Sequence, residues 1–172
     1  AGIVLPVFSL RSRTSFGVGD FGDLRKLIDW AHLCGLKAVQ ILPINDTTRT
    51  GTWADSYPYN AISVFALHPI YMDLNEWGNL PLFQKYREQG EELNALPQLD
   101  YERTYALKTT FLHELFALKG KEICTSEAYS GFVCKNKSWL DPYVSFCHKR
   151  DKYGTADFRM WPQVKAKTEI QS

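Results

Sequence analysis

The sequence predicts an α/β protein whose first part consists of βα units of a parallel sheet and whose second part is mainly helical. Two continuous apolar runs, at residues 2–8 and 38–44, are typical of strands buried on both faces. Between them, residues 20–34 carry apolar side chains at helical spacing. From residue 80 onward, helical periodicity dominates. These three observations set the fold class.

The first strand, helix and second strand form a predicted βαβ unit. Pro6 indicates that the first strand ends there or has a free edge. Asp20 stands at the helix N-cap position with Asp23 three residues on, where carboxylates accept hydrogen bonds from free N–H groups. Gly35 follows the last helical residue and suits a C-terminal cap. A βαβ unit predicts two parallel strands joined by a right-handed crossover.

Three glycines around the start of this helix, Gly17, Gly19 and Gly22, fit the spacing G-x-G-x-x-G of a dinucleotide-binding loop. The loop is too long for such a site, because about ten residues separate it from the strand where a tight turn is needed. The carboxylates of Asp20 and Asp23 would also repel a pyrophosphate. Nucleotide binding is therefore the less favoured interpretation.

Composition excludes several classes of protein. The 172 residues are 45% apolar and 23% charged, with a formal net charge of +1. No strong field favours nucleic acid or a membrane surface, and no apolar run approaches the roughly 20 residues of a membrane-spanning helix. No signal peptide opens the chain, and the lack of an initial Met suggests an excised piece. We expect a cytoplasmic protein with neither nucleic acid nor a membrane as partner.

The cysteines predict neither a metal site nor a cofactor. Cys34, Cys124, Cys134 and Cys147 form no C-x-x-C pair, and no histidine lies at metal-ligand spacing from them. We expect small buried thiols, which favour a reducing compartment.

The loop at residues 45–60 is the candidate ligand site. Its predicted sugar-binding residues are Tyr59, Asp55, Tyr57, Asn60 and Trp53. An aromatic ring can cover the apolar face of a pyranose, and short polar side chains can reach its hydroxyls. A loop that follows a strand is also a usual place for such groups in α/β proteins. The alternative is an ordinary aromatic turn packed on the core.

The remaining segments are predicted more coarsely. Residues 62–67 and 70–74 are apolar, separated by His68 and Pro69. His68 is either a structural loop residue or a contact to a sugar hydroxyl. Helices are predicted at residues 82–86, at 102–119, after Ser126 and at 139–149, with a linker at 94–100.

Several stretches together resemble the glycoside hydrolase family of 4-α-glucanotransferases. They are GIVLPVFSLR at 2–11, GVGDFGDL at 17–24, QILPIND at 40–46, DSYPYNAISVFALHPIY at 55–71, LDYE at 99–102 with Lys108 and Leu112, and WLDPY at 139–143 with Trp161 and Pro162. Asn45-Asp46 and the segment 57–60 are most similar to the plant cytosolic branch, which acts on maltose and branched glucans.

The resemblance implies an N-terminal fragment of a (β/α)₈ TIM barrel with an inserted mainly helical subdomain. Residues 1–79 would supply the first βα units with the sugar-binding loop, giving two strands and at most part of a third. Residues 80–172 would form the helical insertion. The partners implied are the rest of the catalytic barrel and an α-glucan or maltose substrate.

The resemblance also implies a retaining mechanism with an Asp nucleophile, a Glu acid/base and a second Asp that distorts the sugar. These carboxylates lie on later strands of the family's barrel, and no acid here matches them. We therefore predict no catalytic residue in this chain. Tyr59 matches the family tyrosine that stacks on the sugar beside the scissile bond. Tyr57 stands where many members have Ser, and Trp53 is assigned to an acceptor sugar from its position alone.

The resulting expectation is part of a 4-α-glucanotransferase that is inactive as an isolated piece. Two alternatives stay open at this stage: a fragment of an α-amylase-type hydrolase, and a non-catalytic glucan-binding module.

Overall fold

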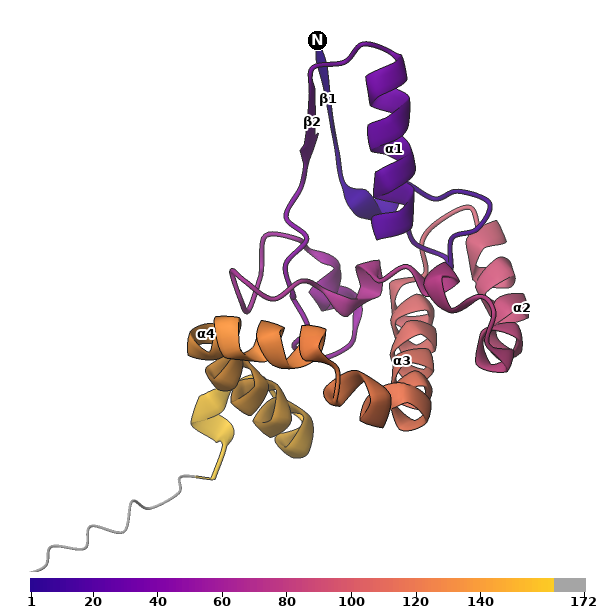
Figure 1. Cartoon of the computed structure of the whole chain (residues 1–172). Helices are drawn as coiled ribbons and strands as arrows, with labels where there is room; N and C mark the ends of the chain where they lie inside the picture. Colours follow the sequence, from indigo (N-terminus) through magenta and orange to yellow (C-terminus); the bar gives the residue numbers. More distant parts are fainter. Residues whose placement is uncertain (163–172) are drawn as a thin grey trace, which may run out of the picture.

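The computed structural model describes residues 1–162 and begins with a parallel pair of strands. β1 (Gly2–Leu5) pairs with β2 (Ala38–Ile41), with Gly2 opposite Ala38 and Leu5 opposite Ile41. α1 (Phe21–Leu33) forms the connection and lies alongside the strands (Figure 1). The predicted βαβ unit is confirmed. β1 ends before Pro6, and a 3₁₀ turn, η1 (Val7–Ser9), follows.

The start of α1 is fixed by the two predicted carboxylates. Asp20 Oδ1 accepts hydrogen bonds from the backbone N–H groups of Gly22 (3.0 Å) and Asp23 (3.2 Å), and Asp23 Oδ2 accepts one from Asp20 N–H (3.4 Å). This reciprocal pair is a capping box. At the other end, Gly35 takes a φ of 70°, which a glycine adopts without steric cost.

The glycines before α1 and in its first turn have packing reasons for their identity. A Cβ at Gly19 would collide with the carbonyl oxygen of Val7, and one at Gly22 would collide with the carboxylate of Asp73. Gly17 has a φ of 80°. Close packing and a left-handed turn therefore account for the spacing without a nucleotide.

Residues 62–67 do not form a third strand. They make only an isolated antiparallel bridge, between Asn45 and Leu67. Ser63 explains the interruption, because its Oγ accepts hydrogen bonds from the N–H groups of Phe65 (3.1 Å) and Ala66 (3.0 Å) and bends the chain locally. Two 3₁₀ turns follow, η3 (Pro69–Tyr71) and η4 (Leu74–Trp77).

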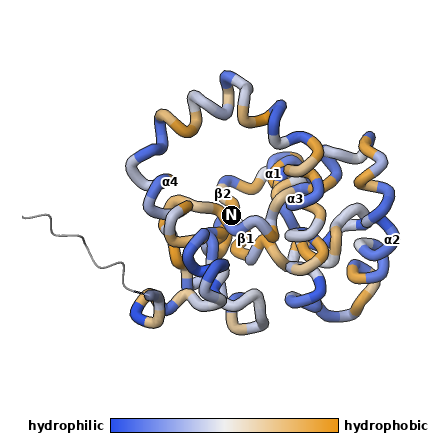
Figure 2. The backbone as a smooth tube through the Cα atoms, turned by 90° about the horizontal axis from the view of Figure 1, so that it is seen from below, coloured by the Kyte–Doolittle hydropathy of each residue, from blue (hydrophilic) through white to orange (hydrophobic). Residues whose placement is uncertain are grey.

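The second half of the described chain is helical, as predicted, but its helices are longer than expected. They are α2 (Pro81–Ala95), α3 (Tyr101–Cys124) and α4 (Glu127–Tyr153), followed by a short 3₁₀ turn, η5 (Phe158–Met160). The two helices predicted after Ser126 are in fact one helix, which contains Pro142. Figure 1 shows α4 changing direction along its length, and Figure 2 shows part of it standing away from the rest of the chain.

Two hydrophobic clusters hold these elements together. In the larger, α2 and α3 pack against residues that precede them, with Phe111 and Leu74 fully buried and the rings of Phe16 and Phe83 5.4 Å apart. The other cluster is built from Val7, Val18, Ile70, Tyr71 and Tyr101, with Ile41 at the end of β2 packed against it. Each cluster therefore combines residues from before and after residue 80, where we placed a domain boundary. The last ten residues of the predicted insertion, 163–172, lie outside the described part.

The prediction of buried cysteines is wrong. Cys34, Cys124 and Cys134 are exposed and Cys147 is half-buried. Cys34 and Cys124 lie at the ends of α1 and α3, and α4, which carries the other two, has no buried residue. Helical spacing alone gave the wrong answer because it does not show which stripe faces the core.

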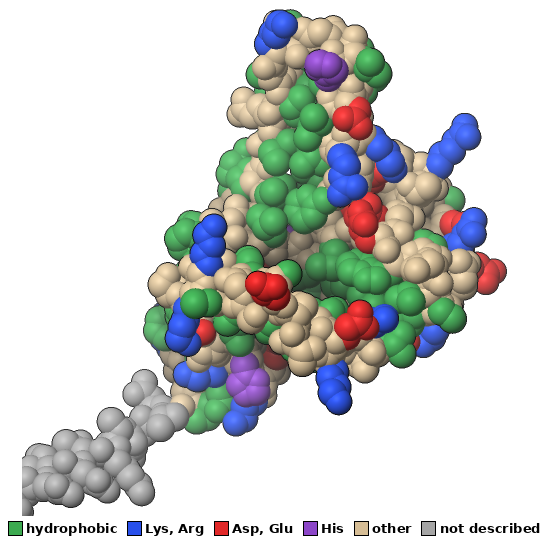
Figure 3. Space-filling model, in the orientation of Figure 1, with side chains coloured by type: hydrophobic (Ala, Val, Ile, Leu, Met, Phe, Trp, Pro, Cys, Tyr) green, Lys and Arg blue, Asp and Glu red, His purple; other side chains and the backbone are tan. Residues whose placement is uncertain are grey.

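Apolar side chains are also exposed along the strand pair and α1. Val4, Ile28, Trp30 and Leu33 are among them. Figure 3 shows hydrophobic side chains along this part of the molecule and around a hollow beneath it. No helix within residues 1–162 is long and apolar enough to cross a membrane.

Candidate functional site

A cavity of about 280 Å³ opens beyond the carboxyl ends of the two strands. Phe8 follows β1, and Pro43 and Asn45 follow β2, so both strands deliver side chains to it. Ligands of parallel sheets usually bind at this end of the strands. The lining combines aromatic and polar side chains: Phe8, Val18, Pro43, Asn45, Thr47, Trp53, Asp55, Ser56, Pro58, His68, Ile70, Tyr71, Gln98, Leu99 and Tyr101.

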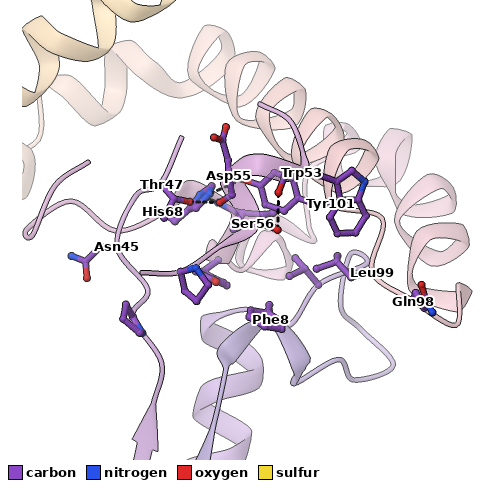
Figure 4. A pocket seen from close by; sticks show the side chains of 15 residues that line it. Phe8, Asn45, Thr47, Trp53, Asp55, Ser56, His68, Gln98, Leu99 and Tyr101 are labelled. Atoms are coloured by element: carbon purple, nitrogen blue, oxygen red, sulfur yellow. Dashed lines mark hydrogen bonds between the residues drawn. The ribbon is translucent and has the colours of Figure 1, made fainter. Parts of the chain in front are cut away.

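Asp55 is the internal anchor of the predicted sugar loop. Its Oδ2 accepts hydrogen bonds from three successive backbone N–H groups, of Arg49 (3.0 Å), Thr50 (2.8 Å) and Gly51 (2.6 Å). Thr47 Oγ1 also donates to its carbonyl oxygen. Figure 4 shows the carboxylate turned away from Phe8. Asp55 therefore lines the cavity while its charge is used to shape the loop.

Trp53 begins a 3₁₀ turn, η2 (Trp53–Ser56), at the wall of the cavity. Its backbone N–H donates to Glu102 Oε1 (3.0 Å), and its carbonyl accepts from Ser56 Oγ (2.8 Å). The indole is 52% exposed, and its ring centre is 6.2 Å from that of Tyr101. The backbone is thus fixed while half of the ring stays available to a ligand.

The other three predicted site residues lie on the surface beside the cavity. The rings of Tyr57 and Tyr59 are 5.5 Å apart and about 60% exposed, at 61% and 60%. Asn60 Oδ1 accepts a hydrogen bond from Arg49 Nη2 (3.2 Å). The structure thus brings Trp53 and Asp55 to the cavity and leaves the two tyrosines as a neighbouring, outward-facing pair.

His68 and Tyr101 form a buried polar pair in the cavity wall (Figure 4). The backbone N–H of Ile70 donates to His68 Nδ1 (3.2 Å), and His68 Nε2 lies 3.0 Å from Tyr101 Oη. Burial lowers the pKa of His68 to about 4, so the ring is neutral near pH 7. Since Nδ1 is an acceptor, Nε2 carries the hydrogen and donates it to Tyr101. The hydroxyl hydrogen of Tyr101 is then available to an acceptor in the cavity.

Asp55 is the acid among the residues that line the cavity. Its Oδ2 holds the loop, whereas its Oδ1 is buried without a hydrogen-bond partner among the described residues. Asp46 is bound by Tyr143 Oη (2.6 Å) and Thr48 N–H (2.9 Å). Within residues 1–162, no group of three His, Cys, Asp or Glu side chains is arranged to hold a metal ion. The arrangement therefore suits binding and orienting a polyhydroxylated ligand by ring faces, amides and hydroxyls.

Sequence reasoning missed Tyr101, Gln98 and Thr47 as residues of this cavity. Tyr101 stands just before the helix predicted at 102–119 and was given no role of its own; it is only 3% exposed. Gln98 lies in the predicted linker, where its side chain had no assigned role. Two signals were available for Tyr101: its position beside a helix start, and its place in the stretch LDYE at 99–102 that resembles the family.

A parallel strand pair with a helical crossover and a cavity beyond its carboxyl ends defines an α/β protein with a ligand site in the usual position for such sheets. Comparison with known families identifies the group more closely: the family model described as 4-alpha-glucanotransferase matches residues 5–171. The chain belongs to this family.

Individual relatives agree with this assignment. The chain is 39% identical over 164 residues to 4-alpha-glucanotransferase DPE2 of Oryza sativa subsp. japonica, covering 94% of this chain and 17% of that protein. It is 34% identical to a 4-alpha-glucanotransferase of Chlamydia muridarum over 93% of this chain and 30% of that protein. For the Chlamydia caviae protein of the same name, the identity is 37%, over 99% of this chain and 32% of that protein. The chain therefore spans between a sixth and a third of the length of these relatives.

Proposed function

We propose that this chain is the N-terminal part of the catalytic domain of an enzyme that transfers glucosyl or glucan units between α-1,4-glucans with retention of configuration. Family membership supports transfer rather than hydrolysis as the main reaction. The observation that carries the proposal is the cavity at the carboxyl ends of β1 and β2. Its volume of about 280 Å³ is at the small end of ligand sites, which run from about 300 Å³ upward, and suits a single sugar unit of a longer glucan.

We propose that β1 and β2 are the first two strands of a (β/α)₈ barrel. Parallel strands are normally covered on both faces and paired on both edges. Among the described residues, 1–162, the sheet has two strands, and Val4, Trp30 and Leu33 are exposed beside it. Further strands and helices of a longer polypeptide would pair the free edges and cover these side chains. In this proposal residues 80–172 are a helical insertion packed on the first βα units, residues 1–79.

The proposed glucan contacts divide into two groups. The first is the cavity wall, where Trp53 offers a half-exposed ring and Tyr101 offers a hydroxyl hydrogen. The second is the outward-facing pair Tyr57 and Tyr59, next to Asn60. In this proposal Tyr59 covers the sugar beside the scissile bond, and Trp53 covers an acceptor sugar. Asp55 contributes by fixing the backbone between them.

The carboxylates that break and form glycosidic bonds are proposed to lie on strands that follow this chain. Retention needs two carboxyl groups about 5–5.5 Å apart on either side of the bond. Asp55, the acid in the cavity wall, uses Oδ2 to bind three backbone N–H groups, and Asp46 is engaged by Thr48 N–H and Tyr143 Oη. We further propose that the protein is cytoplasmic and accepts maltose, as the similarity of Asn45-Asp46 and residues 57–60 to the plant branch suggests.

The direct test uses the intact protein with maltotriose. Transfer conserves the number of reducing ends while producing longer and shorter glucans, whereas hydrolysis adds one reducing end per event. We expect redistribution of chain lengths with a nearly constant count of reducing ends. Trp53→Phe and Trp53→Ala should raise KM for the acceptor in that order, because ring area is lost stepwise. A rise in reducing ends that matches bond cleavage would assign the protein to the hydrolases, and glucan binding without redistribution would make it a binding module.

A further inference from the structure

Asp46 lies at the base of the loop formed by residues 47–60 and joins the two ends of that loop. Its backbone N–H donates to Ala66 O (2.9 Å), and its carbonyl accepts from Ile62 N–H (2.8 Å). Its Oδ1 accepts from Thr48 N–H (2.9 Å). The segment that leaves β2 and the segment that returns after the loop are thus both tied to one residue.

The second carboxylate oxygen of Asp46 is bound by α4, about a hundred residues further along the chain. Tyr143 Oη donates to Asp46 Oδ2 at 2.6 Å. Arg150 Nη1 lies 3.9 Å from the same oxygen and donates to Thr48 O at 2.9 Å. Tyr143 and Arg150 are seven residues apart, two turns of helix, so they face the loop from the same side of α4.

Burial makes these bonds strong. Asp46 is 2% exposed, and a buried carboxylate is costly unless donors and a cation compensate it. Tyr143 and Arg150 supply both. Burial, together with the bond to Asp46, raises the pKa of Tyr143, so its hydroxyl keeps the hydrogen that it donates. Hydrogen bonds to an ionised acceptor are about twice as strong as neutral ones.

The apolar contacts of α4 are weaker guides to its position. No residue of α4 is buried. Its main ring contact to the loop region is the stack of Trp139 on Phe65, with centres 5.5 Å apart, and Phe65 remains 60% exposed. The polar contacts to Asp46 and Thr48 are therefore the specific link between α4 and the loop.

The link continues directly into the proposed glucan site. Thr48, whose carbonyl Arg150 holds, is followed by Arg49, Thr50 and Gly51, whose N–H groups bind the Asp55 carboxylate. Asp55 belongs to the same turn as Trp53. A displacement of Thr48 would thus move residues 49–51, their hydrogen bonds to Asp55, and the turn that carries the Trp53 ring at the cavity.

We propose that Tyr143 and Arg150 are positioning residues. By fixing Asp46 and Thr48, they hold the loop formed by residues 47–60 in the conformation that binds glucan. This inference rests on the proposed function, since it takes the loop to contact the sugar. It assigns to the helical part of the chain a role in substrate binding without contact to the substrate.

The test compares Tyr143→Phe with Tyr129→Phe in the intact protein. Both changes remove one hydroxyl from α4, but the hydroxyl of Tyr129 makes no hydrogen bond to any residue in the described range. The first measurement is trypsin cleavage after Arg49, an exposed residue of the loop, with the site confirmed by mass spectrometry. The second is kcat and KM for transfer from maltotriose. Circular dichroism checks that each variant is folded.

We expect Tyr143→Phe to accelerate cleavage after Arg49 by about tenfold, the effect of losing one hydrogen bond to a charged group. KM should rise several-fold with a smaller change in kcat. The loop contributes to binding of the glucan, whereas the carboxylates of the chemical step are proposed to lie on other strands. Tyr129→Phe should change neither measurement. Arg150→Lys keeps the charge but cannot reproduce the planar donor geometry, and it should act in the same direction.

The two measurements separate the possible failures. Unchanged cleavage in folded Tyr143→Phe and Arg150→Lys would overturn the inference that α4 holds the loop. Faster cleavage with unchanged KM would show that the loop is held by α4 but does not bind glucan, and so would overturn the positioning role. Failure of the wild-type protein to transfer glucan at all would instead contradict the proposed function. If Tyr143→Phe does not fold, the Arg150→Lys variant decides the outcome by the same criteria.

Discussion

Lys108 and Asp20 form an ion pair shielded from solvent, with Lys108 Nζ 3.6 Å from Asp20 Oδ2 and both side chains at most 2% exposed. Lys108 Nζ also donates to the carbonyls of Ile70 (2.7 Å) and Met72 (2.8 Å). Asp20 at the same time caps α1. Burial lowers the pKa of Lys108 to about 8 and raises the pKa of Asp20 to about 6. One lysine thus connects α3, the turn after His68 and the start of α1.

Lys108→Met should therefore destabilise the protein strongly. It leaves the Asp20 carboxylate uncompensated and two carbonyls without a donor, and breaking a buried pair typically costs about 3–5 kcal/mol. Urea unfolding of the intact protein, followed by circular dichroism, measures the change. Adding Asp20→Asn should restore part of the loss, because an uncharged amide can still cap the helix.

The control for this change is Lys85→Met, at an exposed lysine that pairs with Glu114. Exposed pairs contribute little, so its midpoint should stay close to that of the wild type. Equal losses in the free energy of unfolding for the two lysine substitutions would show that the buried ion pair stabilises the protein no more than the exposed one.

His68 makes stability depend on pH on the acid side. Its pKa is about 4 when folded and about 6.5 when unfolded. Between these values the unfolded state binds more protons, so this contribution to stability is lost as pH falls from about 6.5 toward 4. The raised pKa of Asp20, about 6, acts in the opposite direction over a similar range. The two contributions must be separated by a variant.

His68→Asn isolates the histidine. At pH 7 the variant should be less stable, since the bond to Tyr101 is lost. The difference from wild type should shrink as the pH is lowered to about 4.5, because only the wild type loses the His68 contribution. Urea midpoints of both proteins at each pH give this difference, and His113→Asn, at an exposed position of α3, controls for removal of a histidine. A difference that is constant with pH would contradict the buried, neutral state of His68.

Tyr59→Ala in the intact protein should lower kcat/KM for transfer from maltose. Loss of ring stacking is worth about 0.5–1.5 kcal/mol beyond area burial, or roughly two- to tenfold. If the contact tightens as the sugar ring flattens, part of the loss appears in kcat. Tyr59→Phe keeps the ring face and should be much milder. Wild-type kcat/KM in a folded Tyr59→Ala variant would assign the ring to loop packing alone.

Purified residues 1–172 should not transfer glucose from maltose or maltotriose. In the proposed enzyme the nucleophile and acid/base lie outside this chain, and their loss removes many orders of magnitude in rate. Glucose release and chain-length analysis would measure transfer, alongside the intact protein at equal concentration. Turnover by the pure piece would place catalytic carboxylates among residues 1–172.

The first βα unit could be predicted because its signals are local. The Asp20 cap, the glycine after α1 and the apolar runs each act over a few residues. The single helix α4 could not be predicted, because Pro142 normally ends or kinks a helix and only the tertiary structure shows that this one continues. The exposed cysteines belong to the same category, since spacing does not show which side of a helix is covered.

The candidate site was predictable in part for the same reason. Trp53 and Asp55 follow a strand in sequence, so a loop site was expected there. Tyr101 reaches the cavity from the start of α3, and Tyr143 reaches Asp46 across 97 residues of sequence. Contacts of that separation leave no trace in residue spacing. Such contacts depend on tertiary packing and become visible only in the three-dimensional structure.

The Asp55 carboxylate also bears on how this protein could diversify. By binding three consecutive N–H groups, it fixes the path of the loop through backbone atoms, which every amino acid except proline supplies. The side chains at positions 53, 57 and 59 can then be exchanged without redrawing that path. In the proposed enzyme, preference for short or branched glucans would then change by substitution of these side chains while the backbone of the loop is inherited unaltered.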